Sequence, residues 1–217
     1  MSENKLDHQT ATTSEEILRR SYSMKSSEDA LAVYRDWAAT YDDHLEGDLR
    51  YLSPEGVAAL AAEWISDRDA PVLDIGCGTG LTGQATSAHG FRTIDGIDIS
   101  PEMIAVALSK GIYRQIYQGD LTKPISLPDA SYAGAVSSGT FTHGHVGAVA
   151  FDEIFRVLRK GAIFACTIHR HIFEELGFKD KIKAMEADGR LRVRHLHEAP
   201  LFETAEPDGL YYVFERL

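Results

Sequence analysis

The sequence predicts an α/β fold built on a mostly parallel sheet, with an antiparallel pair of strands at its C-terminal edge. Short apolar segments alternate with helical patterns between residues 72 and 187, which is typical of βαβ units whose sheet is covered on both faces. A glycine-rich turn, VLDIGCGTG, follows the first strand at 72–80. The tail reads as two extended segments, 192–202 and 210–217. Because only a short AEPDG turn joins them, they cannot be connected by a crossover helix.

The N-terminal part of the chain predicts a helical cap in front of the sheet. Residues 1–26 are polar and lack a lasting hydrophobic period, so we expect a flexible arm or, alternatively, a lid. Ser27 begins a predicted helix whose apolar residues recur at three- and four-residue steps up to Gly47. Pro54 starts a second helix. We therefore divide the chain into the arm (1–26) and one domain (27–217), with the cap at 27–70 and the core at 71–217.

The core elements follow in regular alternation, without an internal repeat or a linker. Together with the two tail segments, they predict seven strands. The expected core strands cover 72–76, 92–97, 112–118, 133–137 and 161–168, and the expected helices cover about 80–89, 101–109, 148–158 and 172–187.

Composition limits the classes of partner. The 217 residues carry a net charge of −11, which argues against a nucleic-acid partner, since nucleic-acid binders usually present a basic face. Cys77 and Cys166 are too far apart in sequence to suggest a disulfide framework. No segment approaches the ~18 apolar residues of a membrane helix, and the N-terminus lacks an apolar leader. We expect a soluble, cytoplasmic protein, a monomer or homodimer, without a membrane partner.

The ligand of the glycine turn is the central question, because dinucleotide enzymes and methyltransferases share such turns. The spacing Gly76-x-Gly78-x-Gly80 differs from the G-x-G-x-x-G of pyrophosphate binders. Asp74 would repel a phosphate and attract an amino group. Asp98 ends the second strand, where a carboxylate can accept both ribose hydroxyls. These residues indicate an amino acid nucleoside as ligand, with a nucleotide-dependent reductase as the alternative.

The chain resembles the class I S-adenosylmethionine-dependent methyltransferases of the small-molecule type. Four segments stand in the order of that family: VLDIGCGTG, GIDISPEMIAVA, YQGDL and EIFRVLRKGAIF. The resemblance covers about residues 55–217 and departs at Lys160-Gly161-Ala162, where the family often has Pro-Gly-Gly. The segment YRDWAATYD at 34–42 is similar to a helix that precedes the core in many of these enzymes. The stretch GTFTHGHV at 139–146 resembles the methyltransferase-like proteins of the Williams-Beuren region.

This resemblance implies a Rossmann-like class I methyltransferase fold and S-adenosyl-L-methionine as cofactor. Asp74 and the glycines would surround the amino acid end of the cofactor, and Asp98 would accept from the ribose. Asp120 would take the adenine amino group, while Tyr41 would close the site. The implied cofactor-binding residues are Asp74, Gly76, Cys77, Gly78, Gly80, Asp98, Ile99, Asp120, Leu121, Ser138 and Tyr41.

Histidines follow the fourth and fifth strands, where we expect the wall of the acceptor site. His143 is the candidate general base, since a histidine with a pKa near ~6.5 can take a proton from a hydroxyl, thiol or amine. Alternatively, His143, His145, His169 and His171 are surface or hydrogen-bonded histidines. Because no i, i+4 pair or carboxylate cluster accompanies them, we expect no metal site.

The expected function is therefore methyl transfer from S-adenosylmethionine to an oxygen, nitrogen or sulfur atom of a small molecule. A cofactor-binding protein without catalysis is the alternative from another class.

Overall fold

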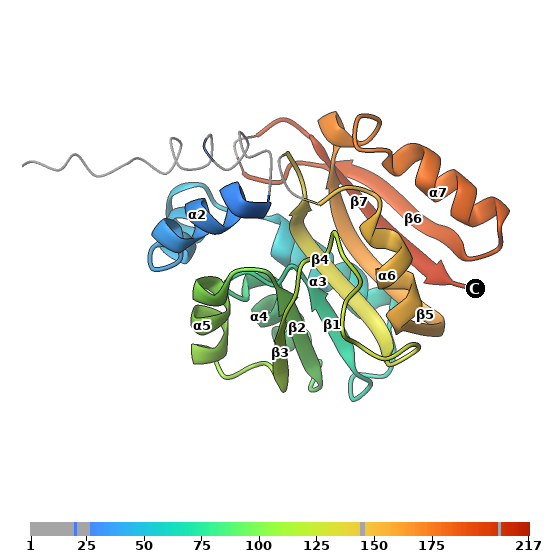
Figure 1. Ribbon diagram of the computed structural model, residues 1–217, viewed down its shortest axis with the longest axis horizontal. Helices are drawn as coiled ribbons and strands as arrows, with labels where there is room; N and C mark the ends of the chain where they lie inside the picture. The colour runs from blue at the N-terminus through green and yellow to red at the C-terminus, as the bar shows by residue number, and fades with distance from the viewer. Residues whose placement is uncertain (1–19, 21–26, 144–145, 204) are drawn as a thin grey trace, which may run out of the picture.

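The computed structural model describes residues 20, 27–143, 146–203 and 205–217, so the arm expected at 1–26 lies outside the described residues except for Arg20. Seven strands form one sheet in the order β3-β2-β1-β4-β5-β7-β6 (Figure 1). The strands are β1 Val72–Ile75, β2 Ile94–Asp98, β3 Gln115–Gln118, β4 Tyr132–Phe141, β5 Leu158–His169, β6 Leu191–Ala199 and β7 Gly209–Arg216.

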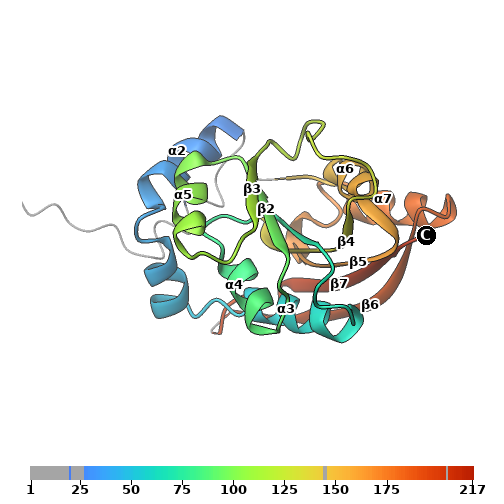
Figure 2. The same cartoon turned by 90° about the horizontal axis from the view of Figure 1, so that it is seen from below.

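Helices flank the sheet on both faces (Figure 2). The first five strands in spatial order are parallel, and β7 pairs antiparallel with both β5 and β6, as the sequence predicts. The α-helices are α2 Ser27–Trp37, α3 Ser53–Trp64, α4 Leu81–Ala88, α5 Pro101–Ser109, α6 Ala150–Val157 and α7 Phe178–Ala187; short π- and 3₁₀-helical turns are η1 Asp43–Asp48 and η2 Arg170–Ile172.

The core lies on the two faces of the central strands. Every residue of β1 is buried, as expected for a parallel strand covered on both sides. Its side chains alternate: Val72 packs with the apolar face of α3, whereas Leu73 and Ile75 pack with α6 and α7 on the other face. The carboxyl ends of the parallel strands therefore meet at one edge of a rigid sheet.

The predicted helix from Ser27 to Gly47 is divided in the structure. α2 ends at Trp37, a turn follows, and η1 continues to Asp48. This helical cap packs its apolar residues, Trp37 and Leu45 with the half-buried Tyr41, against Leu81 at the start of α4.

Two other predicted boundaries shift for physical reasons. The helix expected over 172–187 begins only at Phe178, because Gly177 adopts a left-handed φ of 75° at its start. The fourth strand, expected to end at Ser137, continues to Phe141 through an irregular register. The residues expected to end that strand therefore remain part of the sheet edge.

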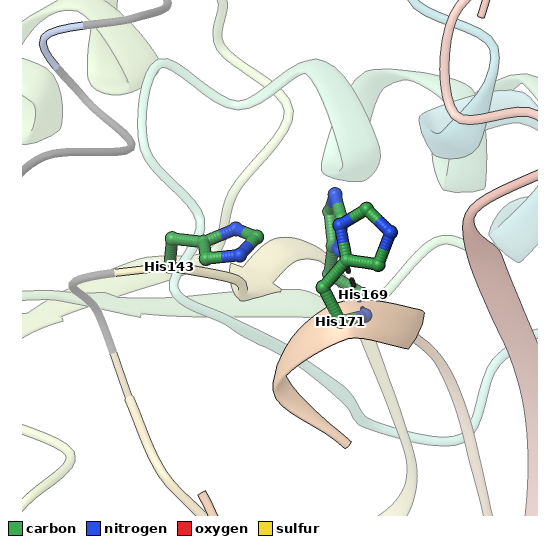
Figure 3. A group of neighbouring side chains, drawn as sticks. All are labelled: His143, His169 and His171. Atoms are coloured by element: carbon green, nitrogen blue, oxygen red, sulfur yellow. Dashed lines mark hydrogen bonds between the residues drawn. The ribbon is translucent and has the colours of Figure 1, made fainter. Parts of the chain in front are cut away.

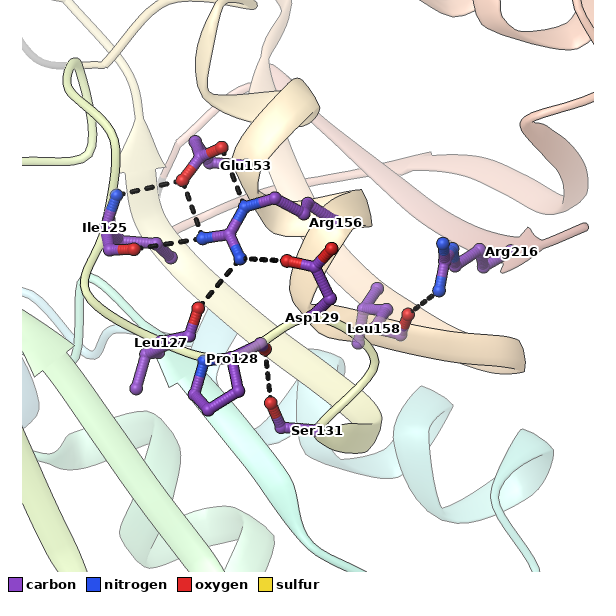
Figure 4. A network of polar contacts seen from close by, with 9 residues as sticks. All are labelled: Ile125, Leu127, Pro128, Asp129, Ser131, Glu153, Arg156, Leu158 and Arg216. Carbon is purple, nitrogen blue, oxygen red and sulfur yellow. Dashed lines mark hydrogen bonds and ion pairs between the residues drawn. The ribbon is translucent and has the colours of Figure 1, made fainter.

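Arg156 on α6 ties down the loop between β3 and β4 (Figure 4). Its guanidinium donates to the backbone carbonyls of Ile125 and Leu127 at 2.9 and 2.8 Å and to the carboxylates of Asp129 and Glu153. Glu153 in turn accepts from the amide of Ile125 at 2.9 Å. The hydrogen bonds from Arg156 hold the pKa of Glu153 below its usual range.

Within the described residues, no helix is both long and apolar enough to cross a membrane.

Candidate functional site

A cavity lies at the carboxyl ends of β1, β2 and β4, and its empty volume is about 750 Å³ when the open solvent at its mouth is included. This is where the strand order reverses, between β1 and β4, and open parallel sheets bind ligands at such a point. The lining combines glycines and carboxylates with apolar side chains: Tyr34, Tyr41, Gly76, Gly78, Asp98, Ile99, Met103, Gly119, Asp120, Leu121, Thr122, Ser138, Gly139, Thr140 and Val146.

The glycine turn brings backbone to the cavity in conformations that side chains disfavour. Gly76, Gly78 and Gly80 have φ values of 65°, 52° and 94°. A Cβ on Gly76 would lie 2.3 Å from the Oγ1 of Thr140, so β1 and β4 approach closely there. A Cβ on Gly78 would meet no protein atom within 4 Å, which leaves open space for a ligand against this backbone.

Two of the implied binding residues in this turn do not line the cavity. Cys77 is buried and packs toward Gly96 of β2, and burial raises the pKa of its thiol. Gly80 lies behind the turn, against the ring of Tyr113. Cys77 and Gly80 therefore support the turn from behind and do not line the cavity.

Asp98 lies in the lining and holds the turn at the same time. Its Oδ2 accepts from the amide of Gly78 at 2.8 Å, and its Oδ1 accepts from the amide of Ser100 at 2.9 Å. Burial raises the pKa of Asp98, opposed by these hydrogen bonds. Ser100, rather than Asp98, caps α5 by accepting from the amide of Met103. The Asp98 carboxylate is therefore available to face a ligand.

Asp120 also lines the cavity, in the turn after β3. Thr122 donates its amide and hydroxyl to Oδ1 of Asp120, and Lys123 lies 2.9 Å from Oδ2. Burial opposes ionisation of Asp120, but these contacts outweigh it and hold its pKa below the usual range. Its immediate neighbours Leu121 and Thr122 complete this wall.

Asp74, implied to reach the amino group of the cofactor, lies outside the cavity lining. It is fully buried in β1 and accepts a 2.7 Å hydrogen bond from the phenol of Tyr113. Burial raises its pKa to about 7, against the effect of that hydrogen bond. Side chains along a strand point to opposite faces in turn, and that of Asp74 points to the face covered by α4, where Tyr113 lies.

The cap closes the cavity from one side. Tyr34 and Tyr41 lie in the lining, and burial raises the pKa of the Tyr41 phenol. Asp42, the next residue, joins the cap to the core: Thr79 of the glycine turn donates to its Oδ1 at 2.5 Å, and Lys110 lies 2.7 Å from its Oδ2. Tyr41 thus forms part of the cavity wall, and Asp42 holds this end of the cap against the core.

Ser138 of β4 lies in the floor of the cavity, next to Tyr51. The hydroxyl of Tyr51 lies 3.1 Å from Oγ of Ser138. A Cβ on Gly139 would lie 2.5 Å from the same hydroxyl, so the left-handed Gly139 gives Tyr51 room to approach the strand. Tyr51 stacks on Phe202 with ring centroids 4.9 Å apart.

Three histidines meet at the end of β4 and β5 (Figure 3). His143 belongs to the segment between the lining residues Thr140 and Val146, and its ring centroid lies 4.6 Å from that of His169 and 6.1 Å from that of His171. His145 lies outside the described residues. The expectation of no metal site rested on local spacing, and that argument does not hold, because parallel pairing of Phe141 with Ile168 brings the histidines together.

Sequence reasoning missed several residues of the site. Asp42 and Thr79 form the fastening of the cap, and Tyr51 supports its floor. Asp42 and Thr79 both had a signal, since Asp42 completes the YRDWAATYD segment and Thr79 lies within the VLDIGCGTG turn. Of the other lining residues, Thr122 stands outside the segments that carry the resemblance, whereas the rest lie within them: Tyr34, Met103, Gly119, Gly139, Thr140 and Val146.

The cavity fits an adenosyl amino acid. Ile99, Met103 and Leu121 offer apolar surface for a purine, and the carboxylates of Asp98 and Asp120 offer acceptors for hydroxyl and amino groups. The bare backbone at Gly78 admits a ligand at close range.

Comparison with known proteins gives the same assignment. A family model described as "Methyltransferase domain" matches residues 73–166. Methyltransferase-like protein 27 of Homo sapiens is 26% identical over 174 residues, covering 77% of this chain and 68% of that protein. The O-methyltransferase rstn1 of Aspergillus nomiae is 30% identical over 134 residues, 58% of each chain. The 18S rRNA (guanine(1575)-N(7))-methyltransferase of Saccharomyces cerevisiae is 36% identical over 66 residues, 30% of this chain and only 24% of its own length.

Solved structures share the fold. A chain of the Haloferax volcanii complex that contains the Trm112 methyltransferase activator matches with a TM-score of 0.63 and 21% identity, covering 84% of this chain and 97% of its own. An S-adenosylmethionine-dependent methyltransferase of Mesorhizobium loti matches with a TM-score of 0.57 and 19% identity, covering 75% and 100%. The glycine turn alone left a reductase open, and these matches decide against it. Residues 73–166 of the chain match a methyltransferase domain, and the fold is that of the S-adenosylmethionine-dependent methyltransferases.

Proposed function

We propose that the protein transfers the methyl group of S-adenosylmethionine to an oxygen, nitrogen or sulfur atom of a small molecule. The observation that carries this proposal is the fastened cap, which brings Tyr34 and Tyr41 into the cavity lining and is held by Asp42. Donor and acceptor have to share the cavity that these two rings line. This favours an acceptor small enough to enter beneath the cap.

The charges around the cavity support a small acceptor over a nucleic acid. Arg35 of α2 lies 3.4 Å from Glu102, Lys110 lies 2.7 Å from Asp42, and Lys123 pairs with Asp120. Each of these cations already has a carboxylate partner, and the whole chain carries a net charge of −11. Phosphate backbones are bound by Lys and Arg that are free to neutralise them.

The relatives point to two classes of acceptor. The Aspergillus relative is named an O-methyltransferase, which agrees with a small hydroxyl-bearing acceptor. The yeast relative is named an rRNA guanine-N7 methyltransferase, and its higher identity makes RNA the second candidate. That match covers only 30% of this chain, so it weighs less than the cap and the charges.

The residues of the site have distinct tasks in this reaction. When bound, S-adenosylmethionine would supply a methyl group on a positively charged sulfur, and the neutral thioether would leave as the acceptor atom attacks the methyl carbon in line. Asp98 holds the ribose, and the rings of Tyr34 and Tyr41 exclude water. His143, in the sequence segment between the lining residues Thr140 and Val146, takes the proton of a protonated acceptor. We also propose a reducing, cytoplasmic location, since Cys77 and Cys166 are both free thiols.

The test is a screen that measures S-adenosylhomocysteine released with small phenols, carboxylic acids, thiols and amines, and in parallel with total rRNA and tRNA. We expect turnover with one class of small molecule and none with RNA; methylation of RNA alone would overturn the small-molecule proposal.

The role of His143 is tested by His143→Ala. We expect slower turnover, because the proton acceptor is lost. The affinity for S-adenosylhomocysteine, measured by calorimetry, should be unchanged, because Asp98, Asp120 and the glycine turn hold the donor. Full activity of the variant would remove His143 from the reaction.

A further inference from the structure

We propose that His143, His169 and His171 bind a divalent transition metal ion, Zn²⁺ being the best match. One nitrogen from each imidazole lies within 4.8 Å of the other two. They come from three different places, the segment after β4, the end of β5 and η2. Figure 3 shows the His143 side chain reaching across toward the other two rings. Nitrogen ligands at converging positions are the usual donor set for Zn²⁺.

The distances suit closure on a metal ion. Zn–N bonds of ~2.0–2.1 Å in a tetrahedral site place ligand nitrogens about 3.4 Å apart. The present separations, up to 4.8 Å, therefore need to shrink by no more than about 1.4 Å. His171 is exposed and His143 only half-buried, so side-chain rotation can supply this movement. The buried His169, 3% exposed, provides the fixed ligand.

Two contacts of His169 orient its ring. Nε2 lies 3.3 Å from Oδ2 of Asp208, in the turn before β7. Nδ1 accepts a long 3.3 Å hydrogen bond from the amide of His171. An imidazole that donates from Nε2 to a carboxylate keeps its lone pair on Nδ1, and metal-bound histidines are commonly oriented by a carboxylate in this way. Asp208 thus orients the ring of His169, and the contact at Nδ1 is long.

Among the described residues three protein ligands converge, which leaves a fourth position for an outside ligand, as in catalytic rather than structural zinc sites. The segment that carries His143 runs between the lining residues Thr140 and Val146. If the methyl acceptor enters there, an oxygen or sulfur bound at the open position loses its proton to solvent more easily. This second part rests on the proposed function and makes His143 a ligand instead of a free base; metal binding itself does not depend on it.

Metal binding is tested by calorimetry with Zn²⁺ on full-length protein freed of metal by a chelator. Another pair of histidines must be removed first. Nε2 of His195 and Nδ1 of His197 on β6 lie 2.8 Å apart at the surface and can chelate ions. In the His195→Gln/His197→Gln background we expect one equivalent of Zn²⁺ to bind. His171→Ala should weaken that binding by at least about 100-fold, since even loss of an outer partner costs 10–100-fold.

The matched control is His89→Ala, which removes an imidazole paired with Glu55 at 2.8 Å, far from β5 in sequence. It should leave Zn²⁺ affinity unchanged. Co²⁺ in place of Zn²⁺ should show the visible absorption of a four-coordinate ion, lost in His171→Ala. His171→Gln and His143→Gln repeat the test if the alanine variant is unfolded, as judged by loss of S-adenosylhomocysteine binding.

Each outcome decides. Absence of a one-equivalent site, or a site equally strong in the His171 and His143 variants, would overturn the proposal. Once an acceptor is known, a chelator should stop turnover and Zn²⁺ should restore it. Chelator-resistant turnover with intact metal binding would discard only the role toward the acceptor. Failure to find any acceptor would count against the proposed function and leave the metal result standing.

Discussion

Asp74 shows how one buried carboxylate can couple the methyltransferase fold to pH. It lies fully buried beneath the glycine turn, with the Tyr113 phenol as a hydrogen-bond donor at 2.7 Å. Because burial raises its pKa to about 7, the folded protein keeps a proton that an unfolded Asp loses near pH ~3.9. The stability that this group contributes is present at low pH and falls as the pH rises from about 4 through 7.

Asp74→Asn should therefore flatten the pH dependence of stability. The amide of Asn resembles the protonated acid and can still accept a hydrogen bond from Tyr113. At pH 8 the variant should therefore have a higher free energy of unfolding than the wild type, by on the order of a few kcal/mol. At pH 4 the two free energies should differ little. Urea unfolding at pH 4, 6 and 8 measures this, with the exposed Asp69→Asn as control. Parallel pH curves for wild type and Asp74→Asn would contradict it.

Asp98 combines a structural and a binding task. Its carboxylate already accepts from the amides of Gly78 and Ser100, and it faces the cavity. Carboxylates in charge-assisted hydrogen bonds are among the stronger polar contacts of a site.

Asp98→Ala should weaken the binding of S-adenosylhomocysteine by about 1.5 to 3 kcal/mol, the range for a hydrogen bond to a charged group. Titration calorimetry provides the measurement, and circular dichroism checks that the turn survives. Asp69→Ala, at an exposed carboxylate outside the cavity lining, serves as control. Unchanged affinity in Asp98→Ala would exclude this carboxylate from the donor site.

At the scale of elements, α6 acts as the anchor of the loop between β3 and β4. Arg156 reaches two backbone carbonyls and one carboxylate of that loop, and the carboxylate of Glu153 on α6. The loop starts with Asp120 and Leu121, which line the cavity. The position of this wall thus depends on a guanidinium on the far side of the loop.

Arg156→Lys should destabilise the protein by about 1 to 3 kcal/mol, because an ammonium cannot serve all four acceptors in the fork geometry of a guanidinium. Chemical denaturation measures the loss. The control is Arg159→Lys, whose side chain makes a single exposed hydrogen bond to the carbonyl of Ser131. Equal stability of the two variants would show that the network is not needed.

At the scale of the whole molecule, a helical cap is held over a sheet edge by few polar contacts. Asp42 accepts from Thr79 and pairs with Lys110, while Trp37, Leu45 and Leu81 form a small apolar cluster behind it. Small clusters with few buried contacts open more easily than a domain core. Opening here would admit the donor and the acceptor.

Asp42→Ala should release the cap without unfolding the core. We expect S-adenosylhomocysteine to bind about 1 to 2 kcal/mol more weakly, as for loss of a charged hydrogen bond, and to dissociate faster. Stopped-flow release measures the rate. Asp43→Ala, at the exposed neighbouring position, controls for helix effects. Similar release rates in both variants would mean that the cap does not gate the site.

Local signals predicted much of this arrangement. The helix expected over 101–109 is found at those bounds, because Ser100 and Pro101 form a complete start signal. The strand and glycine turn at 72–80 also occur where expected, and the antiparallel tail is confirmed. Gly177 marks the limit of such reasoning: the helical period continues through it, and only its left-handed conformation shows where α7 begins.

The sequence by itself determined the class of fold and the methyl donor, since both depend on residues close together in the chain. Strand, turn and helix of the glycine motif are adjacent, so their chemistry can be read without knowing the rest. Only the tertiary structure turned Asp74 toward Tyr113, joined Asp42 to Thr79 and gathered His143 with His169 and His171. Such contacts arise from strand order and register, which bring together residues that no local period connects.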